Sequence, residues 1–378
     1  MTATLQDPAA LVEDGYLLLP AFAEPHAHLD KAFLAERVPN PTGDLMGAIL
    51  AMDAARPTIT VADTIERAER AARLMLTNGT TAIRTHVDAT TGNGLMSVEA
   101  LIDVRERLRG VVDIQICALT GWPSIGPEGA DARALLREAI AMGVDVVGGC
   151  PHLETDPHEA NENFLSIAAE AGLAVDLHTD ECLDADVLAL EDLARRVIDS
   201  GFPHPVVASH CVSLGMQTEA RQQEVSDLVA AAGISVVVLP QTNLFLQGRS
   251  HQSCMPRALT AVKALRAAGV NVAAGADNLQ DPFNPVGRAD ALETASLMVM
   301  AAHLLPDEAL ATVTSAPRQA MGLSDPGDRV AIHAASVREA IAMAPGGRIV
   351  LRARLTPPFM SDRQGDAAPP TRGRDDRR

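Results

Sequence analysis

The stretch EPHAHLDK (residues 24–31) follows directly on the apolar run YLLLPAF (residues 16–22). An apolar run of this length is typical of a buried strand, which predicts a strand over residues 16–28. Because side chains alternate along a strand, His26 and His28 are expected to point the same way. Two neutral imidazoles held side by side can chelate one divalent metal ion. The stretch therefore predicts part of a metal site at the end of a strand.

Short runs rich in Val, Ile and Ala recur along the chain, and amphipathic segments separate them. Eight strands are predicted, at residues 16–28, 81–88, 112–120, 144–151, 173–181, 205–211, 234–243 and 270–278. Strand–helix alternation favours a parallel sheet, so the fold class is α/β. Eight such repeats over about 260 residues match a closed (β/α)8 barrel of the TIM type. A doubly wound open sheet is the alternative, but it would not need polar residues at so many strand ends.

Titratable side chains stand at the ends of these predicted strands. A lone histidine is more often a structural residue, and Asp277 could simply cap the next helix. In a barrel, however, the carboxyl ends of all strands meet at one rim, and one metal ion needs ligands from several strands. The combined pattern therefore favours a metal-binding site at this rim over unrelated structural roles. The set comprises His26, His28, His86, His178, Glu181, His210 and Asp277.

Composition narrows the classes of partner. The formal net charge is −18, which argues against nucleic acid or an anionic membrane and suits an enzyme for a neutral or cationic small molecule. The five cysteines are scattered and odd in number, which fits a reducing cytoplasm rather than a disulfide framework. The sequence has no apolar stretch of transmembrane length, and its beginning does not look like a secretion signal. We therefore expect a cytoplasmic location.

Several blocks of the sequence resemble the amidohydrolase superfamily, and within it the cytosine deaminase-like group. The resemblance runs from Leu18 to about Ser315 and implies a TIM-type barrel with a mononuclear metal site. It rests on EPHAHLDK (24–31), RTHVD (84–88), GVDVVGG (143–149), HTDE (178–181), ASH (208–210), LQGR (246–249) and GADNLQDPFNP (275–285).

The resemblance implies a role for each residue of the site. One divalent ion, zinc or iron(II), would be bound by His26, His28, His178 and Asp277. His210 would polarise the hydrolytic water, and Glu181 would shuttle a proton. Binuclear members of the superfamily usually bridge two metals with a carbamylated lysine on the fourth strand. No lysine lies near residues 144–151, which supports a single ion; Cys150, the other possible bridge there, is expected to be a small buried residue.

The implied reaction is hydrolytic deamination. A metal ion makes hydroxide available near neutral pH, and Asp277 can take a proton while the hydroxide attacks a carbon that bears an amino group. Glu181 then protonates the adjacent ring nitrogen and the leaving amine. We expect an aminohydrolase for a cyclic amidine or guanidine, such as a pyrimidine, purine, pterin, creatinine-like or triazine ring. The alternatives are a hydrolase of an alkylamino-triazine or cyclic amide ring, and a metal-binding scaffold without activity.

Five residues are candidates for substrate contact. His86 could touch the substrate or form a structural network with Arg84 and Asp88. The segment ALTGWPS (118–124) lacks the glutamine that reads the pyrimidine amide in cytosine deaminases, and Asn278 replaces the second aspartate that cytosine-specific members tend to carry. Both differences point to a ring other than cytosine. The full set of candidates is His86, Trp122, Gln247, Asn278 and Asp281.

The domain organisation follows from these elements. Residues 16–323 are expected to form the barrel, with helices at 290–305 and 306–323. Residues 1–15 and 324–361, with strands at 329–333 and 347–354, are expected to form a small β-sandwich appendage from both termini. Related enzymes have a longer β-rich segment before the first barrel strand, so the appendage could be incomplete, with an edge that a second copy covers. We therefore expect a homo-oligomer. Residues 362–378, rich in Gly, Pro, Asp and Arg, are expected to be a disordered tail.

Overall fold

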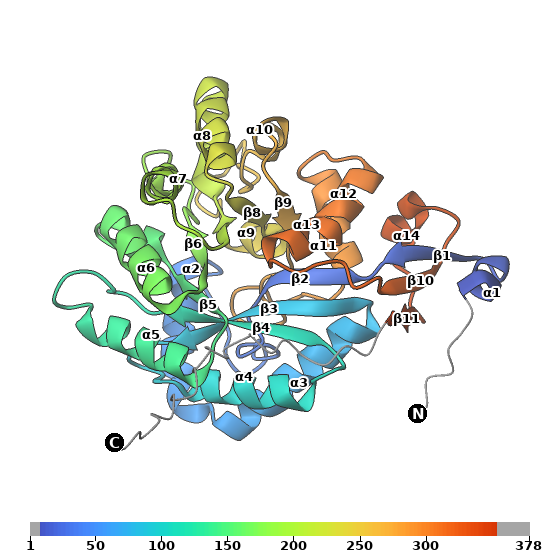
Figure 1. The fold of residues 1–378 in the computed structure, drawn as a ribbon, viewed down its shortest axis with the longest axis horizontal. Coiled ribbons are helices and arrows are strands. Elements are labelled where there is room, and N and C mark those ends of the chain that lie inside the picture. Colours follow the sequence, from blue (N-terminus) through green and yellow to red (C-terminus); the bar gives the residue numbers. More distant parts are fainter. Residues whose placement is uncertain (1–7, 354–378) are drawn as a thin grey trace, which may run out of the picture.

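The computed structural model describes residues 8–353, so the tail predicted at 362–378 lies outside the described residues. Its main feature is an eight-stranded sheet in which neighbours follow chain order and all pairs are parallel (Figure 1). Together with the surrounding helices, this sheet forms the predicted TIM-type barrel. The strands are β2 (Phe22–Ala27), β3 (Thr80–Ala89), β4 (Asp113–Thr120), β5 (Val146–Gly149), β6 (Ala174–Thr179), β7 (Val206–His210), β8 (Ser235–Val238) and β9 (Val272–Ala274).

The barrel closes between β2 and β9 through few contacts. A single parallel bridge joins Ala27 to Asp277. Below it, the buried carboxylate of Glu24 accepts hydrogen bonds from the backbone N–H groups of His26 and Ala276, each at 3.0 Å. One side chain of the first strand therefore holds the segment that follows the last strand.

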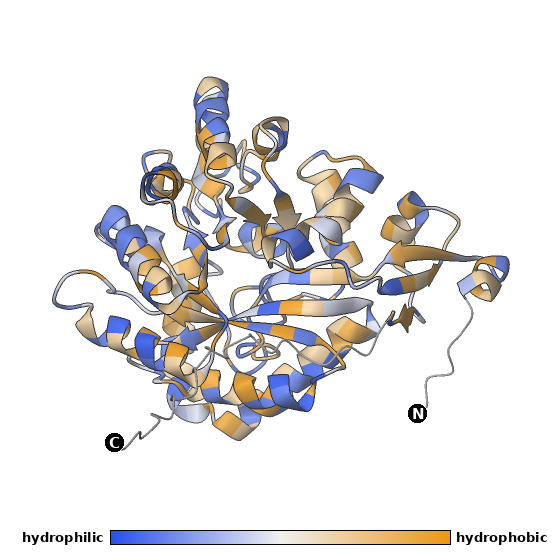
Figure 2. Ribbon diagram, viewed as in Figure 1, coloured by the Kyte–Doolittle hydropathy of each residue, from blue (hydrophilic) through white to orange (hydrophobic). Residues whose placement is uncertain are grey.

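Helices cover the outside of the barrel, except for α2 and α9 at the rim, and their ends follow ordinary capping rules. Thr60 and Asp156 accept hydrogen bonds from backbone N–H groups in the first turns of their helices, while Gly143 and Gly172 end theirs with φ values of 100° and 68°. Figure 2 shows hydrophilic residues on the outward sides of helices such as α6 and α8. The helices are α2 (Leu45–Ala55), α3 (Val61–Thr77), α4 (Met96–Arg107), α5 (Ala130–Met142), α6 (Pro157–Ala171), α7 (Ala189–Ser200), α8 (Glu219–Ala231), α9 (Pro240–Leu246), α10 (Val262–Ala267), α11 (Ala291–Met300), α12 (Pro306–Thr312) and α13 (Ser315–Ala320), with short 3-10 turns η1 (Arg56–Thr58), η2 (Pro151–Leu153) and η3 (Val212–Met216).

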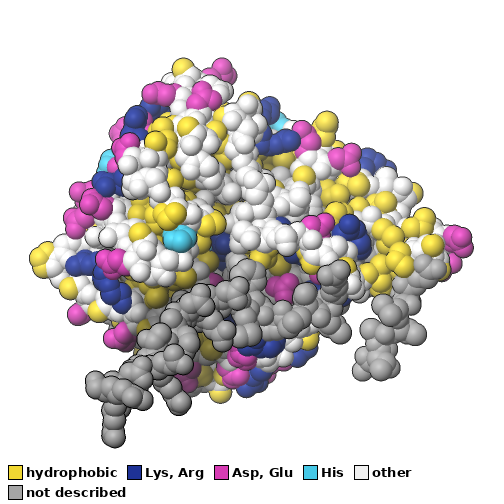
Figure 3. All heavy atoms as spheres, viewed as in Figure 1, with side chains coloured by type: hydrophobic (Ala, Val, Ile, Leu, Met, Phe, Trp, Pro, Cys, Tyr) yellow, Lys and Arg dark blue, Asp and Glu magenta, His cyan; other side chains and the backbone are white. Residues whose placement is uncertain are grey.

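A small antiparallel sheet lies beside the barrel, in the strand order β1-β10-β11. It consists of β1 (Tyr16–Pro20), β10 (Arg329–His333) and β11 (Ile349–Leu351), with α1 (Pro8–Glu13) and α14 (Val337–Met343) packed near it. On the face seen in Figure 3, acidic and basic side chains are intermingled, and apolar side chains gather near this sheet. No helix among residues 8–353 is both long enough and apolar enough to span a membrane.

Several predicted boundaries were wrong. The predicted strand at 16–28 is two strands, because the backbone changes partner: Ala21 N–H bonds to Asp328 O, and Phe22 N–H bonds to Gly79 O. An apolar run does not reveal which sheet it pairs with, so the barrel begins at β2 and not at residue 16. The predicted β-sandwich is a single sheet within the described residues, and residues 8–13 form a helix. The predicted strand at 234–243 ends at Val238, and α9 begins at Pro240. The predicted helix at 306–323 is divided into α12 and α13.

Candidate active site

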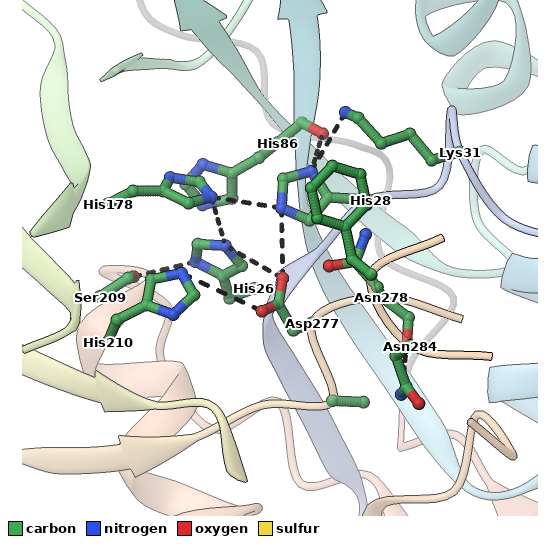
Figure 4. Close-up of polar contacts among 12 residues, drawn as sticks. His26, His28, Lys31, His86, His178, Ser209, His210, Asp277, Asn278 and Asn284 are labelled. Carbon is green, nitrogen blue, oxygen red and sulfur yellow. Dashed lines mark hydrogen bonds and ion pairs between the residues drawn. The ribbon is translucent and has the colours of Figure 1, made fainter. Parts of the chain in front are cut away.

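The four predicted metal ligands converge at the carboxyl ends of β2, β6 and β9 (Figure 4). The Nε2 atom of His178 lies 3.2 Å from Nε2 of His26 and 3.2 Å from Nε2 of His28. The Oδ1 atom of Asp277 lies 3.2 Å from Nε2 of His28 and 3.6 Å from Nε2 of His26. All four side chains are buried. Residues that are up to 251 positions apart in the chain (26 to 277) therefore meet at one point.

This cluster, which we call the ligand cluster, fits a divalent cation. Ligand atoms placed tetrahedrally about 2.1 Å from one ion lie roughly 3.4 Å apart, close to the distances above. Both carboxylate oxygens of Asp277 are buried without a hydrogen-bond partner among residues 8–353. Burial and neighbouring imidazoles hold the pKa values of His26 and His178 well below the usual range, so both rings are neutral and can offer lone pairs.

Hydrogen bonds orient two of the imidazoles. The Ser209 hydroxyl donates to Oδ1 of Asp176 at 2.8 Å, so its oxygen accepts from Nδ1–H of His26 at 2.9 Å. The Nδ1–H group of His28 donates to the carbonyl oxygen of His86 at 3.1 Å. Both rings therefore carry their proton on Nδ1 and direct the Nε2 lone pair towards the centre of the ligand cluster. Outer partners of this kind commonly fix the tautomer of a metal-binding histidine.

His86 itself lies beneath the ligand cluster. Its ring stacks on that of His26 with the centroids 3.8 Å apart, and its Nε2 is 3.5 Å from Oδ2 of Asp176. The same carboxylate pairs with Arg84 at 2.9 Å. The structure therefore places His86 in a buried network of the kind given as the second interpretation above. Arg84 belongs to that network, whereas Asp88 does not.

Glu181 and His210 stand beside the ligand cluster. The Nδ1 atom of His210 lies 3.5 Å from Oε1 of Glu181, and its Nε2 lies 4.0 Å from Oδ2 of Asp277. Burial, reinforced by the charge of Asp277, raises the pKa of Glu181 well above its usual range and so favours the protonated carboxyl. Burial lowers the pKa of His210 to about 4, so its ring is neutral. A protonated carboxyl next to a metal site can act as a general acid.

Sequence reasoning missed Asn243, which joins these two groups. Its Nδ2 atom donates to Oε1 of Glu181 at 3.3 Å and lies 3.1 Å from Nδ1 of His210. Asn243 is the last residue of the strand predicted at 234–243, but in the structure it belongs to α9. Pro240 was the available signal, since proline is favoured in the first turn of a helix.

A pocket opens above the ligand cluster, with about 700 Å³ of space including the part open to solvent. Lys31 and Arg56 lie on one wall and pair with Asp88 at 2.7 Å and 3.1 Å. Apolar side chains from α2, from β4 and the loop after it, and from the loop after β9 form much of the remaining wall. These are Leu45, Ile49, Met52, Leu119, Trp122 and Phe283.

The other predicted substrate contacts are divided between this pocket and its surroundings. Trp122 and Asn278 line the pocket, although the tryptophan is 42% exposed. Gln247 lies behind the pocket wall and donates to the backbone oxygen of Glu181 at 2.9 Å. Asp281 is fully buried and accepts from Asn278 Nδ2 at 2.7 Å. The last two therefore support residues of the pocket instead of lining it.

Comparison with known proteins identifies the family of this chain. The model of the amidohydrolase family matches residues 41–328, and the chain belongs to that family. A pterin deaminase from Rhizobium rhizogenes is 35% identical over 366 residues, which cover 93% of this chain and 82% of the relative. The crystal structure of 5-methylcytosine deaminase from Klebsiella pneumoniae with 5-fluorocytosine is 29% identical, with a TM-score of 0.83, and covers 96% of this chain and 92% of that one.

A further solved structure is N-isopropylammelide isopropylaminohydrolase from Burkholderia multivorans. It is 32% identical with a TM-score of 0.76, and the match covers 90% of this chain and 86% of that one. The resemblance to the amidohydrolase superfamily and its cytosine deaminase-like group is thereby confirmed.

Proposed function

We propose that this chain is a metal-dependent hydrolytic deaminase that releases ammonia from a cyclic amidine, and that its ring is a pterin or a close relative. The observation that carries the deaminase class is the buried carboxyl of Glu181 at the edge of the ligand cluster, where burial and the charge of Asp277 raise its pKa and favour the protonated form. Hydrolytic removal of an amino group needs an acid next to the attacked carbon, because neither the ring nitrogen nor the amine is a good acceptor of electrons until it is protonated.

The ligand cluster supplies the other half of the reaction. A divalent cation held by His26, His28, His178 and Asp277 would activate a water molecule. Asp277 would accept a proton from that water as its oxygen adds to the amino-bearing carbon. Zinc and iron(II) both accept imidazole and carboxylate ligands, so we propose one ion of either kind.

Glu181 completes the proton balance. Its carboxyl donates a proton to the ring nitrogen next to the attacked carbon, which gives a tetrahedral intermediate. The proton taken up by Asp277 then reaches the leaving amine through Glu181. The C–N bond breaks with release of ammonia, and the proton of the added hydroxyl group returns to Glu181 as the ring carbonyl forms. The neutral ring of His210, 4.0 Å from Oδ2 of Asp277, would orient the water and the developing oxyanion.

The choice of a pterin rests on two supports. The relative with 35% identity over most of both chains is a pterin deaminase. The pocket also has apolar walls suited to a flat ring, including Ile49, Met52 and Trp122. An alkylamino-triazine is the second candidate, because one relative with 32% identity is an N-isopropylammelide isopropylaminohydrolase.

We further propose that the protein acts on a free small molecule, and not on nucleic acid or a membrane, as a cytoplasmic homo-oligomer. The net charge of −18 disfavours polyanionic partners. The five cysteines are free, which fits a reducing compartment.

The test is ammonia release by metal-free protein that has been loaded with zinc or with iron(II). The panel contains pterin, cytosine, guanine and an isopropylamino-triazine, with isopropylamine measured for the last. We expect the highest kcat/KM on pterin. Release of isopropylamine alone would favour the second candidate. Metal binding with no turnover of any ring would reject the deaminase and leave the scaffold.

A further inference from the structure

His152 is a pocket residue that neither the reaction above nor the ligand cluster uses. It lies in η2, directly after β5. Its Nδ1 is 2.9 Å from the carbonyl oxygen of His178, and because a carbonyl only accepts, Nδ1 must carry the proton. The other ring nitrogen, Nε2, is therefore a lone-pair acceptor.

That acceptor has no partner among the described residues. The side chain of His152 is only 3% exposed, and its Nε2 is buried without a hydrogen bond to any residue in the range 8–353. A buried polar atom left unpaired costs free energy, so it calls for a specific cause. His152 lines the pocket, so a donor on a bound molecule would satisfy it.

The position of Glu181 identifies which donor. Its Oε2 atom lies 3.9 Å from Nε2 of His152, which is too long for a hydrogen bond between the two. The separation suits two partners that bind side by side along one edge of a fused ring. In the proposed reaction, Glu181 donates a proton to the ring nitrogen next to the amino-bearing carbon. The amino group itself must face the ligand cluster to be replaced, so the donor for His152 lies on the other side of that nitrogen.

We propose that His152 is a substrate-binding residue whose Nε2 accepts a hydrogen bond from the N8–H group of a reduced pterin, while Glu181 addresses N1. The proposal rests on the proposed function. In a pteridine, N1 and N8 point to the same side of the fused rings. A 7,8-dihydropterin carries a hydrogen on N8, whereas an oxidised pterin presents a lone pair there, which would face the lone pair of His152. The residue would therefore select the reduced ring.

Two substitutions of His152 distinguish the role of Nε2 as a hydrogen-bond acceptor from the role of the Nδ1–H bond to the carbonyl oxygen of His178, which anchors the ring. His152→Asn places an amide N–H near the Nδ1 position, so it can keep the bond to His178 O, but it has no group at the Nε2 position. His152→Gln can place its amide oxygen near the Nε2 position but gives up the anchor. His158→Asn is the matched control, since His158 is 61% exposed on α6. Metal content and thermal unfolding are measured for all three variants.

The experiment compares kcat/KM for 7,8-dihydropterin and for oxidised pterin under anaerobic conditions. We expect the unmodified protein and His158→Asn to prefer the dihydropterin by about tenfold or more. In His152→Asn the preference should fall to about one, mainly through a higher KM for the reduced ring, with metal content unchanged. His152→Gln should recover part of the preference.

The outcomes separate this proposal from the one on which it rests. Equal use of both pterins by the unmodified protein overturns the role of His152 and leaves the pterin deaminase standing. An equal loss on both rings in His152→Asn also overturns it, since that result marks a proton relay or a structural role. Turnover of other rings but of neither pterin rejects both proposals.

Discussion

Removal of the Ser209 hydroxyl tests how the ligand cluster is organised. Ser209 links Nδ1 of His26 to the carboxylate of Asp176, at 2.9 Å and 2.8 Å. Ser209→Ala deletes both hydrogen bonds and leaves His26 free to place its proton on either nitrogen. Only the tautomer with the proton on Nδ1 can offer Nε2 to a metal ion. Asp176 keeps its contacts with Arg84 and His86, so the network below the site should persist.

The expected size follows from these contacts. Loss of an outer partner of a metal-binding histidine typically weakens metal binding 10- to 100-fold, or about 1.4–2.7 kcal/mol. Two lost hydrogen bonds of about 1 kcal/mol each agree with that range. Competition with a chelating dye on metal-free protein would measure the affinity for zinc.

Ser226→Ala is the matched control. Ser226 is also fully buried, but its Oγ has no hydrogen-bond partner in the described part of the chain, and it lies on α8. The control should bind zinc as the unmodified protein does. Unfolding of the metal-free proteins is measured alongside, because a general loss of structure would lower both stability and affinity. A Ser209→Ala affinity within twofold of the control would refute the argument that this hydroxyl fixes the tautomer.

Three further outcomes are expected. Glu181→Gln should lower kcat by about 100-fold or more with unchanged metal content by elemental analysis, and a variant retaining a tenth of the activity would show that the proton comes from elsewhere. Although burial opposes ionisation, Lys31 and Arg56 lower the pKa of Asp88 from 3.8 to about 2. The Asp88 carboxylate therefore stabilises the folded state fully above pH 3.8, and this contribution is lost as the pH falls towards about 2. In urea unfolding of metal-free protein, the stability difference between the unmodified chain and Asp88→Asn should narrow by about 1 kcal/mol from about pH 5 to about pH 3; a constant difference would contradict this. Gly149→Ala places a Cβ 2.2 Å from Cζ of Phe164 and should cost about 1–3 kcal/mol, whereas Gly346→Ala, which meets no described atom within 4 Å, should be neutral; equal urea midpoints would contradict this.

The barrel and the ligand cluster could be predicted from the sequence for one physical reason. Parallel strands joined by helices place all their carboxyl ends at one rim, so residues that end successive apolar runs must come together. His26, His178 and Asp277 needed only this rule, and in the structure Nε2 of His26 lies 3.2 Å from Nε2 of His178 and 3.6 Å from Oδ1 of Asp277.

The depth at which a side chain lies in the barrel, and the strand with which a segment pairs, were not predictable in the same way. His86 also ends a predicted strand, yet its ring lies under His26 and away from the pocket, because one strand position earlier or later changes which layer of the barrel a side chain enters. The run at 16–22 gave no indication that its first half pairs with β10. His152 had the same signal as the others, a histidine just past a strand end, but a 3-10 turn carries it and no motif marked it.

The narrow closure between β2 and β9 has a consequence for how the protein matures. His26 and His28 belong to the first barrel strand and the residues just after it, whereas Asp277 follows the last strand. A nascent chain therefore cannot form the complete ligand cluster until Asp277 has been synthesised and lies beside His26. A bound cation would then link the segments that follow β2 and β9, and the fraction of chains that hold a cation would equal the fraction in which the barrel has closed.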